Sequence, residues 1–309
     1  MNSPRPETGA ESVRRVEWHE RGERGNTFSL RALRFAALTL GRRAIRPLLY
    51  PLSLYFVLTS PTTRRISREY LARVLPHTPR FRDIWRHVFA FASISLDRVF
   101  LLTGKYPFKV AGHYGPGTLE TARTRGVLLF LSHFGSFEVM RIGAVQKHEL
   151  KLRIVLDLNI GRRFMQALGE LNPEIAAGII DSSNAGPDLA LRVREALDDN
   201  AVVGLMVDRR RAGERSVTVN FLGEPAPFPA SPWLLAAALK VPVLIVFGIW
   251  RGGDRYEAHV ELLSEKIDLP RATREAELQR LVQDYADRLA ARVREAPYNW
   301  LNFYDFWAR

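Results

Sequence analysis

VLLFLSHFGSFEVM, residues 127–140, is the most informative segment of this chain. It opens with five consecutive apolar residues, 127–131, a run typical of a buried β-strand. Ser136 can cap a helix predicted over 136–145, which would put Glu138 in its first turn. A strand that turns directly into a helix is the unit of α/β sheets, whose ligand sites form at the carboxyl ends of strands. We therefore expect a functional site between the strand and the helix.

Apolar runs and amphipathic segments alternate through the rest of the C-terminal two thirds. The runs predict strands at 152–156, 177–180, 201–207, 217–221, 243–250 and 256–263. The segments between them predict helices at 162–171, 187–198, 232–239 and 275–295. This alternation indicates an α/β fold with a central mixed, largely parallel sheet flanked by helices.

The positive charge of the 309-residue chain is concentrated in its first third. Residues 1–110 hold 20 Lys and Arg against 8 Asp and Glu, which accounts for the whole net charge of +12. Between Arg24 and Arg68 there are nine arginines and no acidic residue. Such a block suits an anionic partner: phospholipid headgroups, nucleic-acid phosphates or an acidic carrier protein. The alternative is a solvated helix face.

Three regions follow from these patterns: a disordered tail at 1–26, a helical membrane-associating region at 27–110 and an α/β domain at 111–309. The second region contains a predicted helix at 81–102 and, from Phe28 onward, an amphipathic period. Its apolar face is made of Leu30, Leu33, Ala37, Leu40 and Ala44, and its basic face of Arg31, Arg34, Arg42 and Arg46. Such a helix can lie in a membrane interface, or it can pack on the core. Prolines interrupt the apolar run that follows, so we expect no membrane-spanning helix.

His133 and Glu138 carry the chemistry that the sequence suggests. Across a strand–turn–helix junction their side chains can meet, and a carboxylate beside an imidazole fixes its tautomer for use as a general base. The chain has no cysteine and no Gly-x-Ser-x-Gly motif, so direct attack by an acceptor hydroxyl is the simplest mechanism. A metal site on this pair would need a third ligand that the local spacing does not supply, and we expect no cofactor. His-x4-Glu also occurs by chance, so a structural histidine is the alternative.

The segment HFGSFE resembles the His-x4-Asp/Glu motif of the lysophospholipid acyltransferase superfamily, and it is most similar to the late acyltransferases of lipid A assembly. Further blocks similar to that family follow in order: Asp208-Arg209-Arg210, the segment FLGEPA at 221–226, Val241-Pro242-Val243 and the closing PYNWL at 297–301. The resemblance covers about residues 24–307. The ordered combination is more specific than any single motif.

The resemblance implies a glycerolipid-acyltransferase-like fold that acts at the cytoplasmic face of the inner membrane as a peripheral or monotopic protein. The donor would be a thioester of acyl carrier protein or coenzyme A, and the acceptor a lipid hydroxyl. His133 would be the general base and Glu138 its partner. The implied substrate-binding residues are Gly135, Asp208, Arg209, Arg210 and Gly223. Arginine can hold a phosphate by bidentate hydrogen bonds, although residues 209–211 can also be a solvated loop and Gly223 can simply end a strand.

The chain departs from the lipid A enzymes at its C-terminus, where the sequence LNFYDFW at 301–307 replaces the expected His and Arg. This puts a phosphorylated disaccharide acceptor in question, and an ornithine lipid, a glycerol lipid or a polyene pigment anchor fits as well. The aromatic residues can line an apolar channel or belong to the core. Two other functions stay open. They are a basic nucleic-acid-binding protein, although no nucleic-acid motif is present and we expect no such partner, and a hydrolase that uses the same dyad with water.

Overall fold

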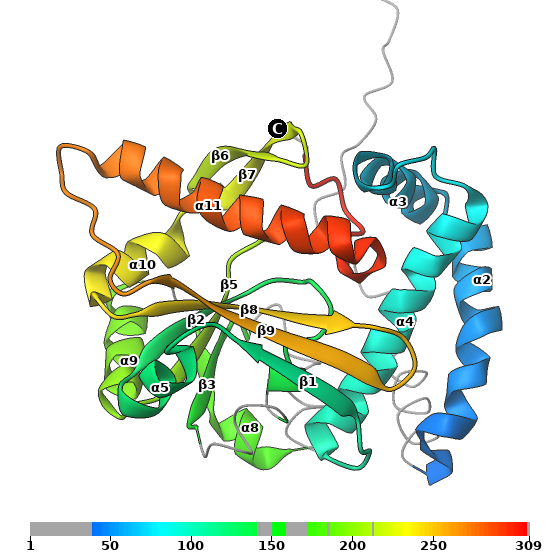
Figure 1. Ribbon diagram of the computed structural model, residues 1–309, viewed down its shortest axis with the longest axis horizontal. Coiled ribbons are helices and arrows are strands. Elements are labelled where there is room, and N and C mark those ends of the chain that lie inside the picture. The colour runs from blue at the N-terminus through cyan, green and yellow to red at the C-terminus, as the bar shows by residue number, and fades with distance from the viewer. Residues whose placement is uncertain are drawn as a thin grey trace, which may run out of the picture.

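A computed structural model describes residues 39–140, 142, 150–158, 172–183, 186–211 and 213–307. Its centre is a seven-stranded sheet with the order β1-β9-β8-β2-β5-β3-β4 (Figure 1). The strands are β1 (Lys109–Tyr114), β2 (Val127–Leu131), β3 (Leu152–Leu156), β4 (Ile179–Asp181), β5 (Val202–Met206), β8 (Val243–Trp250) and β9 (Arg255–Ser264). β8 and β9 pair antiparallel, and the other neighbouring pairs are parallel. The predicted mixed, largely parallel α/β sheet is confirmed.

Both faces of the sheet are buried, which explains why β2 reads as an unbroken apolar run. Leu128 and Phe130 join one core cluster, while Val127, Leu129 and Leu131 join another on the opposite face. Helices cover these faces: α5 (Thr118–Thr124), α8 (Pro173–Ala177), α9 (Pro187–Asp198), α10 (Ser231–Leu239) and α11 (Arg274–Glu295). A separate two-stranded sheet of β6 (Ser216–Phe221) and β7 (Glu224–Pro229) lies beside α11 (Figure 1).

Three helices precede the sheet: α2 (Leu49–Thr59), α3 (Pro61–Val74) and α4 (Phe81–Thr103). Residues 39–45 are helical and lead through the short 3-10 helix η2 (Arg46–Leu48) into α2. Ser60 ends α2 and caps α3, whose first residue is Pro61, a position where the missing amide hydrogen costs nothing. Gly104 ends α4 in the left-handed conformation, as its place after the predicted helix suggests. Val57, Tyr70 and Ile84 enter the same core cluster as β2, so these helices pack on the α/β body.

The faces of the first helical segment are arranged differently from a solvated basic helix. Arg42 is buried in an ion pair with Asp97, and Ile45 is buried beside it. The apolar Leu40, by contrast, is 64% exposed. The basic side of this helix thus contributes to the contact with the body, and part of its apolar side points outward. Among the described residues, no helix has both the length and the hydrophobicity to cross a bilayer.

Element boundaries agree with the sequence prediction for most of the sheet, and the differences have local causes. β1, α5 and β7 were not predicted, and the strand expected at 177–180 starts at Ile179 because α8 extends to Ala177. Residues 137–138 form a turn, so Glu138 precedes the helical residues 139–140 and does not lie in a first turn. The remainder of the helix predicted at 136–145 falls almost entirely outside the described residues. The predicted helix at 162–171 and the tail at 1–26 lie wholly outside them.

Candidate active site

The pairing of β2 with β5 brings His133 next to Asp208. The two strands are parallel neighbours in which Leu131 lies opposite Met206. Carrying the same register two residues beyond each strand puts His133 opposite Asp208, at the carboxyl edge of the sheet. The amide nitrogen of Val207 donates to the carbonyl of Leu131 (3.0 Å), which continues the pairing past the strand ends. The position of the pair therefore follows from the backbone.

The His133 side chain is bound to a fully buried carboxylate. Nδ1 of His133 lies 2.8 Å from Oδ1 of Asp208, and the His133 amide donates to Oδ2 at 2.9 Å. Asp208 is 0% exposed while the His133 side chain is 34% exposed, so the pair is buried at its carboxylate end and accessible at the imidazole. Because an ionised carboxylate only accepts hydrogen bonds, Nδ1 carries the proton and Nε2 keeps its lone pair.

The ionisation of this pair favours a neutral imidazole and an ionised carboxyl. Burial is the largest cause that lowers the pKa of His133, and the charge of Arg209 adds to it, while Asp208 acts in the opposite direction. Burial by itself raises the pKa of Asp208, but the charge and hydrogen bonds of His133 outweigh it and the net pKa is lowered. At neutral pH the imidazole is therefore ready to accept a proton.

Glu138 has different partners from those expected. Its Oε2 accepts a 2.7 Å hydrogen bond from the Ser136 hydroxyl, and its Oε1 lies 2.5 Å from Nε of Arg98 in an ion pair. The carboxylate bound to His133 is that of Asp208, so the structure gives Asp208 the position that the sequence analysis assigned to Glu138. Glu138 is buried, with its side chain 4% exposed, whereas the Arg98 side chain is 32% exposed. Glu138 thus anchors an arginine from α4.

Two arginines surround His133 from different elements. Arg209 directly follows Asp208, and Arg98 of α4 is paired with Glu138 of the same motif; the positive charges of both lower the pKa of His133. Arg209 donates to the carbonyl of Leu301 (2.7 Å) and lies over the ring of Tyr304 at 5.2 Å. Arg210 is half-buried, and the neighbouring Arg211 is tied to Ser182. Of the predicted Arg209–Arg210 pair, Arg209 is the residue whose charge lowers the pKa of His133.

The motif is held by close backbone contacts that require glycine. Gly135 has φ +62°, and a Cβ atom there would lie 1.8 Å from the carbonyl oxygen of Gly248 in β8. The amide of Ser136 donates to that same oxygen at 2.8 Å. On the other side, the Gly135 amide donates to the Asn299 carbonyl (2.7 Å), and the Leu301 amide donates to the His133 carbonyl (2.9 Å). Residues 133–136 are therefore clamped between β8 and the C-terminal segment.

The structure also shows where Gly223 and the aromatic C-terminal segment lie. Gly223, with φ +93°, is the second residue of the two-residue turn between β6 and β7, where a positive φ favours glycine. It therefore ends a strand, which is one of the two alternatives. The aromatic C-terminus belongs to the core: Trp300 and Phe306 are buried and their ring centroids lie 4.9 Å apart. Through its backbone hydrogen bonds to His133 and Gly135, this segment holds the motif in place.

Sequence reasoning missed Arg98 and the bond between His133 and Asp208. The signal for the second was present, since both residues follow buried strands and the carboxyl ends of parallel strands meet at one edge. What the sequence lacked was the knowledge that β2 and β5 are neighbours. Arg98 lies inside a long amphipathic helix among many other arginines, and no local pattern distinguishes it.

Fold and site together define an α/β protein with an accessible histidine at the carboxyl edge of its sheet, a buried aspartate bound to that histidine, and a buried glutamate of the same motif paired with an arginine. The sequence matches the family of bacterial lipid A biosynthesis acyltransferases over residues 114–309. The chain belongs to this family, and its activity is that of an acyltransferase that serves lipid biosynthesis.

The comparison with solved structures finds the crystal structure of the 1-acyl-sn-glycerophosphate (LPA) acyltransferase PlsC from Thermotoga maritima. The two sequences are 16% identical, the match covers 82% of this chain and 97% of that one, and the TM-score is 0.36. No curated protein sequence matches the chain significantly.

Proposed function

We propose that this protein transfers a fatty acyl group from a thioester of acyl carrier protein or coenzyme A to a hydroxyl of a lipid acceptor, with His133 as the general base. The observation that carries the proposal is the His133–Asp208 pair, with Nδ1 and Oδ1 2.8 Å apart and the imidazole still accessible. Asp208 holds the proton on Nδ1. Nε2 is then the atom that takes the proton from the acceptor hydroxyl.

The reaction runs without an acyl-enzyme intermediate. As Nε2 removes the hydroxyl proton, the alkoxide oxygen attacks the thioester carbonyl carbon and the carbonyl oxygen becomes negatively charged. Collapse of this tetrahedral species breaks the carbon–sulfur bond, and the thiolate takes the proton back from the imidazolium. The products are an ester and a free thiol, and the imidazole is returned neutral. Asp208 stabilises the transient imidazolium by charge and hydrogen bonding.

The two arginines beside His133 supply positive charge where negative charge develops. Arg209 donates to the carbonyl of Leu301, whose amide donates to the carbonyl of His133, and Arg98 is paired with Glu138, five residues after His133. In a site shielded from water, fixed cations stabilise an oxyanion or hold a substrate phosphate through charge-assisted hydrogen bonds. In this proposal Glu138 is a positioning residue, because its carboxylate holds Arg98 in place. Its contribution is made through Arg98 and not through the imidazole.

The lipid acceptor would reach this site from a membrane on which helix α2 lies. Of the eleven large hydrophobic side chains that are exposed in the described residues, eight lie between positions 40 and 58. On the inner side of α2, Leu49, Ser53 and Val57 are buried, and the helix runs along α4 (Figure 1). Exposed apolar patches of this kind mark membrane or partner surfaces. We infer a peripheral or monotopic attachment to the cytoplasmic face of the inner membrane.

The test is an acyl-transfer assay with the purified full-length chain, a radiolabelled acyl thioester and vesicles that carry hydroxylated lipids. We expect wild type to form an acylated lipid and His133→Ala to lose about 10²- to 10⁴-fold in turnover, the usual contribution of general-base catalysis. His77→Ala is the matched control because His77 is a half-exposed histidine that pairs with Asp83 and has no contact with His133 or Asp208 among those identified.

Two outcomes would contradict the proposal. Near-normal turnover by a folded His133→Ala protein would exclude this residue as the base. Release of free fatty acid at the same rate with and without a hydroxyl acceptor would identify a hydrolase. Running acyl carrier protein and coenzyme A thioesters side by side identifies the donor, and mass spectrometry of lipids from cells with and without the gene identifies the acceptor.

A further inference from the structure

A second group of chemically active side chains lies at the β1 edge of the sheet. His113 on β1 and His259 on β9 face each other in the parallel register, with their rings stacked at a centroid distance of 4.5 Å. Glu257 lies two residues before His259 on the same face, and its Oε2 is 3.2 Å from Nε2 of His259. One ligand atom from each of the three residues lies within 4.8 Å of the other two.

We propose that His113, His259 and Glu257 bind a divalent transition-metal ion, with zinc as the preferred ion. Two imidazoles and one carboxylate form a common zinc donor set, and water completes a tetrahedron at the open position. In such a tetrahedron the ligand atoms lie about 3.4 Å apart, as follows from bond lengths of roughly 2.0–2.2 Å. The 3.2 Å separation in the His259–Glu257 pair already matches this spacing. His113 is exposed and has room to rotate its ring toward the other two ligands.

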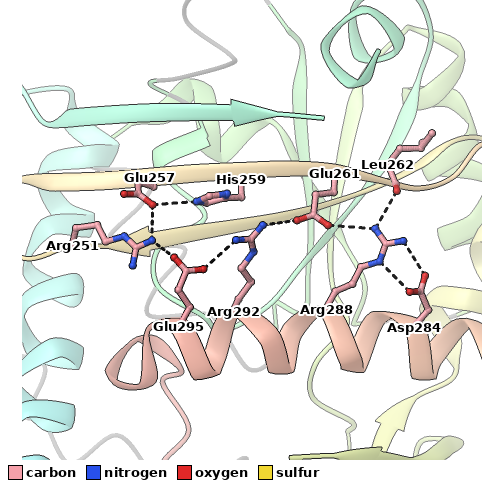
Figure 2. A network of polar contacts seen from close by, with 9 residues as sticks. All are labelled: Arg251, Glu257, His259, Glu261, Leu262, Asp284, Arg288, Arg292 and Glu295. Atoms are coloured by element: carbon pink, nitrogen blue, oxygen red, sulfur yellow. Dashed lines mark hydrogen bonds and ion pairs between the residues drawn. The ribbon is translucent and has the colours of Figure 1, made fainter. Parts of the chain in front are cut away.

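The surroundings prepare Glu257 and His259 for a metal. Arg251 donates to Oε2 of Glu257 at 2.7 Å and also contacts Glu295 of α11 (Figure 2). These contacts hold the Glu257 carboxylate in place beside His259.

The charges around the cluster leave it slightly acidic. Figure 2 shows Glu257, His259 and Glu261 on β9 facing α11, from which Asp284, Arg288, Arg292 and Glu295 extend. The four carboxylates in this network outnumber the three guanidinium groups of Arg251, Arg288 and Arg292. A divalent cation at the open end of this network is therefore not opposed by a net positive charge. Arg251 takes the role of an outer partner that orients the ligating carboxylate.

A metal here would join β1 to β9. β1 ends the sheet and has β9 as its strand neighbour, so its other edge lacks a strand partner within the described sheet. An ion bound to His113 and His259 would cross-link these two parallel strands and stabilise the folded state in proportion to its occupancy. The site stands apart from the His133–Asp208 pair, and the inference does not depend on the proposed acyl transfer.

The test uses the untagged full-length chain, treated with EDTA and dialysed, with zinc chloride titrated in a calorimeter. We expect one zinc per chain at this site and a higher melting temperature with zinc. His113→Ala and His259→Ala should each weaken binding at least about tenfold, since loss of a ligand costs no less than loss of an outer-shell partner. Glu257→Gln keeps the size of the side chain and should also weaken binding. Magnesium, which prefers oxygen ligands, should not compete.

His77→Ala is the control and should bind zinc like wild type. Cobalt gives a second readout: intense visible absorption bands from a tetrahedral site should appear with wild type and disappear with His113→Ala. Unchanged zinc affinity in both folded histidine variants, or no saturable zinc binding by wild type, would overturn the assignment. Competition by magnesium at equal concentration would also contradict it.

Discussion

The active-site edge of the sheet and the outer face of helix α2 depart from ordinary burial in opposite ways. At the sheet edge, Asp208 and Glu138 are ionisable and buried. On α2, Tyr55 and Leu58 are apolar and about 60% exposed. Buried polar groups and exposed apolar patches are the informative exceptions to the rule that apolar residues lie inside. In the first region charged groups are removed from water, and in the second apolar groups are exposed to it, so both arrangements are unfavourable for folding alone.

The two departures differ in how the local structure compensates for them. The buried carboxylates are satisfied inside the protein: Asp208 by His133, and Glu138 by Ser136 and Arg98. The apolar side chains on the outer face of α2 are exposed, and only contact with something outside the chain, such as a lipid surface, would remove them from water. The polar groups of the first region thus find partners within the chain, whereas the apolar side chains on the outer face of α2 stay uncovered within the described residues. Substitutions in the two regions should consequently affect different measurements.

Asp208→Asn should give the largest effect. The amide of asparagine can donate to Nδ1 and so favour the imidazole tautomer whose Nε2 carries hydrogen and cannot accept the hydroxyl proton. We expect turnover to fall by about 10⁴-fold, the loss seen when a triad aspartate is changed to asparagine. The measurement is steady-state acyl transfer, with Asp199→Asn, an exposed carboxylate paired with Lys151, as the control.

The pH profile of this variant gives a readout that a merely structural role would not change. His133 has a lowered pKa, so wild-type activity should be lost on its acid side below the ordinary histidine value of 6.5. Asp208 raises the pKa of His133, and removing its charge should lower that pKa further. The acid limb of the Asp208→Asn profile should therefore move to lower pH. If the acid limb does not move, Asp208 does not influence the ionisation of His133 during the reaction.

Glu138→Gln should have an intermediate effect, because it removes the charge that holds Arg98. We expect activity to fall by about 10- to 100-fold, the range in which a misplaced group near the chemistry acts. Arg98→Gln should cause a similar loss, and the double variant should be little worse than either single one, since the two residues act as a unit. Glu69→Gln, at an exposed carboxylate paired with Arg65, is the control.

Two results would contradict this role for Glu138. Independent, multiplicative losses in the double variant would show that Glu138 does not act through Arg98. A shift of the acid limb like that of Asp208→Asn would show that Glu138 acts on His133 directly, as the His-x4-Glu spacing first suggests.

The sheet was largely predictable because most of its strands are written as continuous or alternating apolar runs. Residues 127–131, 152–156 and 243–250 were predicted with the boundaries that the structure has. β7 was missed because Pro225, Pro227 and Pro229 make it read as a loop. It is tolerated as a strand because it pairs with β6 alone, in a two-stranded sheet where alternate amides need no partner.

Most residues of the candidate site could be predicted from the sequence, but the carboxylate that binds His133 could not. His133, Asp208 and Arg209 were all chosen from the sequence, yet the order of strands in space decides which carboxylate meets the imidazole. The spacing of five residues suggested Glu138 as the partner of His133. The partner is instead Asp208, which lies 75 residues further along the chain and is placed opposite His133 by the pairing of β2 with β5. Likewise, the contact that makes Gly135 necessary involves Gly248, more than a hundred residues later. Such long-range contacts leave no local signature.

The smallest effect should come from the exposed apolar surface of η2 and α2. Replacing Leu48 of η2 and Leu58 of α2 with glutamine removes two apolar side chains that are 55% and 59% exposed, so the melting temperature should stay close to that of wild type. Binding to anionic phospholipid vesicles should weaken by about tenfold, since burying one leucine is worth roughly 1.5–3 kcal/mol when complete and less at an interface. Leu191→Gln on α9 removes an equally exposed leucine, at 57%, and is the matched control in a vesicle sedimentation assay. Equal binding by the α2 variant and the control would mean that this stripe does not contact lipid. Because neither leucine touches His133, activity on a detergent-dispersed acceptor should persist, which separates attachment from catalysis.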